Sequence, residues 1–116
     1  MKILLFCLSF LLSGCSTFLF YPTREYVTDL TAVGIPAKSV ALETPDDIRL
    51  SAWFVPAFDP KTKTETPAKG TILFLHGNAE NISTHILGVL WLSFEGYNIL
   101  ALDYRGFGHS QGSPSL

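Results

Sequence analysis

The fold is decided by two stretches, Thr71-Ile72-Leu73-Phe74-Leu75-His76-Gly77-Asn78-Ala79 and Asn98-Ile99-Leu100-Ala101-Leu102-Asp103-Tyr104-Arg105-Gly106-Phe107-Gly108. Each opens with a short, continuous apolar run, which is typical of a strand buried on both faces of a parallel sheet. Each run ends in a loop that contains glycine. Residues 82–95 lie between them and predict one helix, because their apolar side chains recur at helical spacing: Ile82, Ile86, Val89, Leu90 and Phe94.

The boundaries of this predicted helix agree with its periodicity. Asn81 or Ser83 is a suitable cap for its first turn. Gly96 is a suitable stop at its end. A strand, a helix and a second strand in this order predict a right-handed parallel crossover.

A pair of antiparallel strands is expected before this unit. Residues 39–44 alternate, with Val40 and Leu42 on one face, and Pro45-Asp46-Asp47 supplies turn chemistry. A second strand is expected over residues 48–55 and stops at Pro56, and the polar residues 59–67 are expected to form a surface loop. The fold class is therefore α/β, with an antiparallel hairpin that leads into a parallel strand-helix-strand unit.

The amino terminus has the pattern of a secretory signal. Lys2 precedes an apolar run over residues 3–12, and Leu12-Ser13-Gly14-Cys15 resembles the bacterial lipobox. We expect a lipoprotein signal peptide over residues 1–14, with lipid attached to Cys15. The remaining parts are a lipidated tether and amino-terminal segment over residues 15–38 and a partial α/β domain over residues 39–116.

The expected lipid makes a membrane the first partner, with the protein on the cell membrane or outer membrane and facing the periplasm or exterior. A transmembrane anchor is the alternative, but it needs roughly 20 apolar residues. A second alternative is a secreted protein in which Cys15 is unmodified. The aromatic residues within 16–22 suit either the membrane interface or packing under the domain.

Composition excludes several other partners. The formal net charge is -2, so there is no basic excess and nucleic acid is not expected as a partner. The three histidines, His76, His85 and His109, lack metal-ligand spacing to cysteines or paired carboxylates. We therefore expect neither a metal nor a cofactor.

Chemistry is expected where the two parallel strands end, because loops leave the sheet there. In the first loop Gly77 is expected to permit a tight turn, and the amides that follow it suit an anionic oxygen. In the second loop the glycines are expected to permit sharp folding, and Asp103 and Arg105 are expected to pair and brace it.

The two loops together resemble the α/β-hydrolase superfamily, in particular its Bem46-like and serine-aminopeptidase-like hydrolases. The likeness covers the chain from about residue 40 to its end. It implies that the backbone amides of Asn78 and Ala79 form the oxyanion hole. It also implies loop-shaping roles for His76, Gly77, Asp103, Arg105, Gly106 and Gly108.

A second motif has the wrong surroundings for catalysis. Residues 108–112 match the nucleophile elbow G-x-S-x-G, with Ser110 at its centre. A working elbow lies directly between a strand and a helix, whereas Arg105-Gly106-Phe107 separates the strand from Gly108, and Pro114 stands where the helix would run. No acidic residue or histidine follows Ser110, so the triad is absent and Ser110 is not expected to be a nucleophile.

Two functions remain open at this point. The chain is expected to be the amino-terminal fragment of a lipid-anchored serine hydrolase that acts on small-molecule or peptide acyl substrates through an acyl-enzyme. The alternative is a short non-enzymatic lipoprotein that uses the partial fold as a binding or structural module. A haloalkane-dehalogenase-like activity is a minor third option, suggested by His76-Gly77-Asn78.

In the superfamily strand order 1-2-4-3-5-6-7-8, residues 72–75 form a central strand, so the sheet of this chain is expected to be incomplete with a bare far edge.

Overall fold

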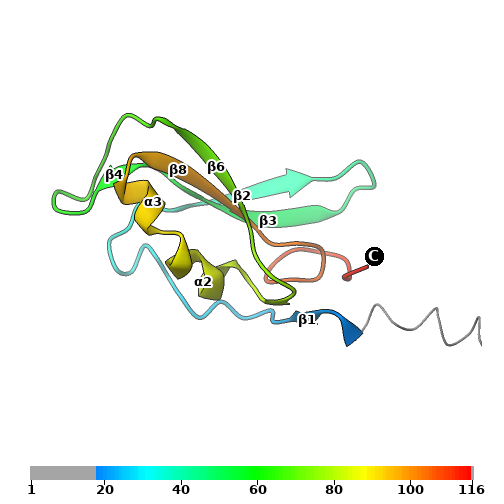
Figure 1. Cartoon of the computed structure of the whole chain (residues 1–116). Coiled ribbons are helices and arrows are strands. Elements are labelled where there is room, and N and C mark those ends of the chain that lie inside the picture. Colours follow the sequence, from blue (N-terminus) through cyan, green and yellow to red (C-terminus); the bar gives the residue numbers. More distant parts are fainter. Residues whose placement is uncertain (1–17, 116) are drawn as a thin grey trace, which may run out of the picture.

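The computed structural model describes residues 18–115, and its centre is a four-stranded sheet (Figure 1). The strands are β2 (Lys38–Glu43), β3 (Arg49–Val55), β6 (Gly70–Leu75) and β8 (Tyr97–Leu102), in the order β2-β3-β8-β6. β3 is antiparallel to both β2 and β8, and β8 is parallel to β6. The hairpin, the parallel crossover and the order 1-2-4-3 predicted from the sequence are confirmed.

The segment between β6 and β8 differs from the single helix predicted over residues 82–95. It consists of helix α2 (Ile82–His85), a 3-10 turn η2 (Ile86–Gly88) and helix α3 (Trp91–Phe94). Glycine is a poor helix former, and the Ser93 hydroxyl donates to the Leu90 carbonyl at 2.6 Å, a back-bond that bends helices. The helical path is therefore broken near Gly88, although its apolar side still faces the core.

Both ends of this segment follow the prediction. The Asn81 side chain accepts from the backbone amide of Ser83 at 2.9 Å, which caps α2. Gly96 has φ +91°, the left-handed conformation common just after a helix. The crossover is thus short, and it returns the chain directly to β8.

One face of the sheet is packed. The helices lie on that face with the segment before β2, and they enclose a continuous apolar core (Figure 1). Its buried members come from the sheet, the helices and residues near position 30: Leu30, Trp53, Val55, Phe58, Ile82, Ile86, Leu90, Ile99 and Ala101. Residues of the expected tether, such as Leu30, therefore pack as part of the domain.

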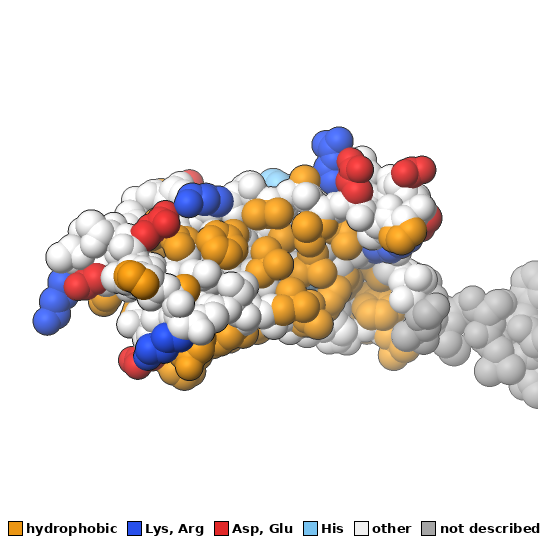
Figure 2. Space-filling view, turned by 90° about the horizontal axis from the view of Figure 1, so that it is seen from above, with side chains coloured by type: hydrophobic (Ala, Val, Ile, Leu, Met, Phe, Trp, Pro, Cys, Tyr) orange, Lys and Arg blue, Asp and Glu red, His pale blue; other side chains and the backbone are white. Residues whose placement is uncertain are grey.

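The other face of the sheet is open. Figure 2 shows apolar side chains gathered over its centre, with charged side chains mostly around the rim. On β6, Leu73 and Leu75 are 57% and 51% exposed. The expectation that β6 is buried on both faces is wrong for the described residues, because α2 and α3 cover one side and no described helix covers the other.

Two pairs of very short strands complete the structure. β4 (Phe58–Asp59) pairs with β5 (Thr64–Glu65), so the expected surface loop over residues 59–67 is partly a small hairpin. β1 (Tyr21–Pro22) lies parallel to β7 (Ala79–Glu80), which the sequence did not indicate. Among residues 18–115 no helix is long and apolar enough to cross a bilayer. The expected signal over residues 1–14 and Cys15 lie outside the described residues.

Candidate functional site

The loops that leave β6 and β8 meet at one end of the sheet. The Tyr104 hydroxyl donates to the His76 carbonyl at 2.7 Å. The rings of His76 and Tyr104 lie 4.6 Å apart, and Phe107 packs against both rings. The two sequence motifs therefore form one contiguous structure, as expected of strands that end at the same edge.

Asp103 is the hub of this structure. Its side chain is fully buried, and its two oxygens accept from the Ile82 amide at 2.8 Å and the Tyr26 hydroxyl at 2.7 Å. Its carbonyl accepts from the Ser110 hydroxyl at 2.7 Å. The Asp103 carboxylate thus connects the start of α2 to the amino-terminal segment, and its carbonyl holds the loop after β8.

The expected brace between Asp103 and Arg105 is wrong. Arg105 instead forms a two-pronged ion pair with Asp46, at 2.6 and 2.5 Å. This hydrogen-bonded pairing lowers the pKa of Asp46 and raises that of Arg105. Arg105 therefore ties the loop after β8 to the turn of the β2–β3 hairpin, and this pair is largely exposed to solvent.

His76 lies beneath the first loop with its side chain fully buried. Its Nδ1 is 2.8 Å from the Gly77 carbonyl. Its Nε2 is 3.2 Å from Asp103 Oδ1, close enough for an ion pair but without the alignment of a hydrogen bond. The ring stacks on that of His85, with centroids 5.5 Å apart. This position suits a residue that supports the loop.

The candidate oxyanion residues lie at the surface, above His76. Asn78 is exposed and Ala79 is half-buried. The backbone amide of Asn78 has no hydrogen-bond acceptor among residues 18–115, while its carbonyl accepts from the Tyr21 amide at 2.8 Å. Gly77 does not have a positive φ, and a methyl group there would meet no described atom beyond its chain neighbours. The backbone conformation at position 77 therefore does not require glycine.

The serine of the elbow-like motif is part of a packed loop. Ser110 is fully buried, and its Oγ accepts from the Ser51 amide at 2.8 Å while it donates to Asp103. Gly108 has φ +49°, and a side chain there would collide with the Asp103 carboxylate. Gly106, also at positive φ, donates its amide to Gln111 at 3.0 Å. The bond from the Ser51 amide holds the loop against β3, and the bond to the Asp103 carbonyl closes the loop on itself.

Two residues of the site, Tyr26 and Arg24, were missed by sequence reasoning, and Asn81 was predicted only as a helix cap. Tyr26 binds Asp103, Arg24 donates to the Ser110 carbonyl at 2.5 Å, and Asn81 donates to Thr23 and Glu25. Tyr26 and Arg24 precede the motifs without a pattern of their own. Only the fold brings them to the loops.

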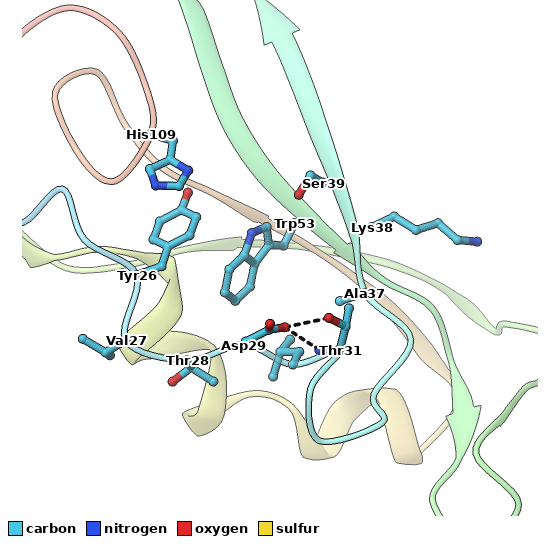
Figure 3. A pocket seen from close by; sticks show the side chains of 11 residues that line it. Tyr26, Val27, Thr28, Asp29, Thr31, Ala37, Lys38, Ser39, Trp53 and His109 are labelled. Carbon is cyan, nitrogen blue, oxygen red and sulfur yellow. Dashed lines mark hydrogen bonds between the residues drawn. The ribbon is translucent and has the colours of Figure 1, made fainter.

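Tyr26 also forms a wall of a cavity of about 450 Å³ between the amino-terminal segment and the sheet (Figure 3). Its ring stacks on His109 and meets Trp53 edge to face. Burial is the main cause that raises the pKa of Tyr26 to about 12; the hydrogen bond with Ser51 opposes this rise, and the hydrogen bond to Asp103 adds to it. No group of three or more His, Cys, Asp or Glu residues within 18–115 is arranged to hold a metal ion.

Comparison with known proteins gives relatives that are much longer than this chain. It is 43% identical over 79 residues to the uncharacterized protein YfhR of Escherichia coli K12, covering 68% of this chain and 27% of that protein. It is 37% identical over 94 residues to the uncharacterized membrane protein YNL320W of Saccharomyces cerevisiae, covering 79% of this chain and 30% of that protein. It is 36% identical over 95 residues to the alpha/beta hydrolase domain-containing protein WAV2 of Arabidopsis thaliana, covering 80% and 29%. No protein-family model matches.

Solved structures give the same fold. The esterase Pf2001 of Pyrococcus furiosus is similar with a TM-score of 0.59 and 24% identity, over 83% of this chain and 35% of the esterase. The α/β hydrolase GrgF of Penicillium sp. sh18 is similar with a TM-score of 0.52 and 25% identity, over 69% and 25%. The strand order and these likenesses agree: the chain belongs to the α/β-hydrolase superfamily. It spans about 30% of the length of these three curated relatives.

Proposed function

We propose that this chain is the amino-terminal part of a membrane-anchored serine hydrolase, of the Bem46-like or serine-aminopeptidase-like kind, that cleaves an ester, thioester or amide. The observation that carries the proposal is the loop of residues 76–79. This loop follows the carboxyl end of β6, and its first residue, His76, is buried beneath the others. The Asn78 amide has no acceptor among the described residues. Such an amide suits the oxygen of a tetrahedral intermediate.

The proposed reaction proceeds through an acyl-enzyme. A serine hydroxyl adds to the carbonyl carbon and gives its proton to a histidine, and the Asn78 and Ala79 amides stabilise the resulting oxyanion. The intermediate then expels the alcohol, thiol or amine, which takes the proton from the histidine. Water cleaves the acyl-enzyme, so the acid leaves and the serine is restored. We assign this serine, its histidine and the acidic residue to sequence outside the 116 residues.

The assignment of the serine is tested with a fluorophosphonate, which phosphonylates activated serines. The protein is labelled as cells produce it, digested and mapped by mass spectrometry. We expect the label on a serine outside residues 1–116, with unchanged labelling in the Ser110→Ala variant. A label on Ser110 overturns the assignment. A protein that takes no label and hydrolyses no activated ester overturns the enzyme proposal and favours a binding module.

The membrane anchor is tested at Cys15. We expect the wild-type protein in the membrane fraction and Cys15→Ala in the soluble fraction, because stable retention then depends on acyl chains. The intact mass shows whether Cys15 is acylated, and Cys7→Ala is the matched control, which we expect to remain in the membrane. Equal release of wild type and Cys15→Ala contradicts the lipoprotein assignment.

A further inference from the structure

The amino-terminal segment lies directly against the candidate oxyanion loop. The Asn78 side chain donates to the Leu19 carbonyl at 2.6 Å, and the Tyr21 amide donates to the Asn78 carbonyl at 2.8 Å. The parallel pairing of β1 with β7 continues this contact, with Tyr21 opposite Ala79. Leu19 and Tyr21 are therefore bonded directly to the candidate oxyanion loop.

The side chains of this segment divide between two environments. Phe20 points toward the domain and packs edge to face on Phe107, with ring centroids 6.3 Å apart. Phe18, Leu19 and Tyr21 are 77%, 47% and 63% exposed. We call these three residues the membrane edge. No charged residue occurs between positions 16 and 23, so contact with an apolar phase does not require the burial of a charge.

The length of chain before the membrane edge limits its distance from a bilayer. Cys15 precedes Leu19 by four residues, a span of at most about 14 Å when fully extended. The apolar run of residues 3–12 ends just before Cys15. Whether the anchor is lipid on Cys15 or the uncleaved apolar run, Leu19 is therefore held within a short distance of the membrane surface.

We propose that the membrane edge lies in the bilayer interface, so that the candidate oxyanion loop opens at the membrane surface and takes amphiphilic acyl esters from the bilayer. This substrate class rests on the proposed function, whereas the membrane contact does not. Tyrosine and phenylalanine suit this location, since their rings bury apolar area and the tyrosine hydroxyl stays in contact with water. The contacts with Asn78 place the loop beside the headgroups.

The contact is tested by spin labels on the intact protein in the membranes of the cells that produce it. Tyr21→Cys and Val33→Cys carry the nitroxide in a Cys7→Ser background. Val33 is a matched control because it is 60% exposed and apolar. Its carbonyl accepts from Lys63, in the turn between β4 and β5, and β4 lies at the opposite end of the molecule from β1 (Figure 1).

Each label is relaxed either by oxygen, which concentrates in lipid, or by a water-soluble nickel chelate. We expect the label at position 21 to respond more to oxygen and less to nickel than the label at position 33. The ratio of the oxygen effect to the nickel effect is expected to be at least about threefold higher at position 21. Equal ratios overturn the membrane contact. Protection of position 21 from both reagents also overturns it and points to a protein partner or another part of the chain on this edge.

The substrate class is tested with Phe18→Ser and the control Val33→Ser. We expect Phe18→Ser to lose about tenfold in hydrolysis of a long-chain aryl ester held in phosphatidylcholine vesicles, and to hydrolyse a water-soluble aryl acetate at the wild-type rate. Equal loss on both esters overturns the proposed source of substrate. If neither ester is cleaved by wild type while the spin labels report lipid contact, the proposed function fails and the membrane edge stands.

Discussion

At the scale of single residues, the site depends on the carboxylate of Asp103, whose partners differ from the Arg105 that the sequence predicted. Asp103 is buried with no lysine or arginine bonded to it among the described residues, and it is stabilised by hydrogen bonds from the Ile82 amide and the Tyr26 hydroxyl. A buried charge needs such donors. The Gly108 backbone passes so close that a larger residue has no room there. The glycine of the second motif therefore makes space for the hub.

We expect Asp103→Asn to destabilise the protein by about 2 kcal/mol. The asparagine side chain lacks the negative charge that strengthens the hydrogen bonds from Ile82 and Tyr26, and its NH₂ group faces one of these two donors. The measurement is pulse proteolysis in urea on the protein as cells produce it. Asp47→Asn is the matched control, since Asp47 is exposed and asparagine tolerates its positive φ of 59°. A midpoint for Asp103→Asn equal to that of the control contradicts the role of the hub.

Tyr26 predicts a specific loss of stability at high pH. Its pKa is about 12 in the folded protein and about 10 in the unfolded chain, so the neutral form is favoured by folding. The corresponding stability is fully present below pH 10 and is lost as pH rises from 10 to 12. Its size is about 2 kcal/mol, because two pKa units correspond to nearly 3 and partial solvent exposure reduces this.

We therefore expect Tyr26→Phe to be less stable than wild type at pH 8 and to show a smaller decline between pH 10 and 12. The urea midpoint measured across this range checks it. Tyr21→Phe, at an exposed tyrosine, is expected to follow the wild-type curve. Parallel curves for wild type and Tyr26→Phe are incompatible with this assignment of the titration.

At the scale of elements, the break between α2 and α3 is a consequence of Gly88 and its neighbours. Gly88 is exposed, its φ is not positive, and a methyl group there meets no described atom within 4 Å beyond its chain neighbours. Alanine is thus compatible with the native backbone at this position. The chain entropy lost on folding is the main cost of glycine here.

We expect Gly88→Ala to stabilise the protein by about 0.5–1 kcal/mol, because alanine restricts the unfolded chain. Gly96→Ala is the opposing control, since Gly96 has φ +91°, and we expect it to destabilise by about 1 kcal/mol. Unfolding midpoints of the two variants give the comparison. A destabilising Gly88→Ala would show that the 3-10 turn requires glycine for a reason other than entropy.

At the scale of the whole molecule, the open sheet face and the edge of β6 determine behaviour in solution. β6 pairs with β8, and no described strand pairs with its other edge. Unpaired strand edges with apolar side chains favour pairing with other chains. The exposed Leu73 and Leu75 lie on this strand.

We expect residues 16–116, produced without lipid, to be insoluble or molten, because folding must offset a chain entropy of order 100 kcal/mol with only one packed face. Thermal unfolding and amide exchange test this, and a monomer with a cooperative transition and protected strand amides contradicts it. Leu73→Lys and Leu75→Lys are expected to raise the soluble fraction, because charges hinder edge pairing. Phe74→Lys, which places the charge against the core, is expected not to do so.

The sequence by itself determined the hairpin, the parallel crossover and the meeting of the two loops. These follow from local periodicity, from turn residues and from the rule that parallel strands end at one edge. Continuous apolar runs did not show which face of β6 would be covered, since the same pattern of apolar residues occurs whether one or both faces of the strand are packed. That depended on where α2 and α3 lie.

Only the tertiary structure decided the partners of the site. Asp103 binds Tyr26 at a separation of 77 residues, Arg105 pairs with Asp46 at 59, and Asn78 binds Leu19 at 59. Local patterns cannot encode such contacts, because each joins segments whose proximity exists only after the sheet has formed. Arg105 had a carboxylate two residues away and paired with a distant one, since Asp103 points into the core while Arg105 points to solvent at the hairpin turn.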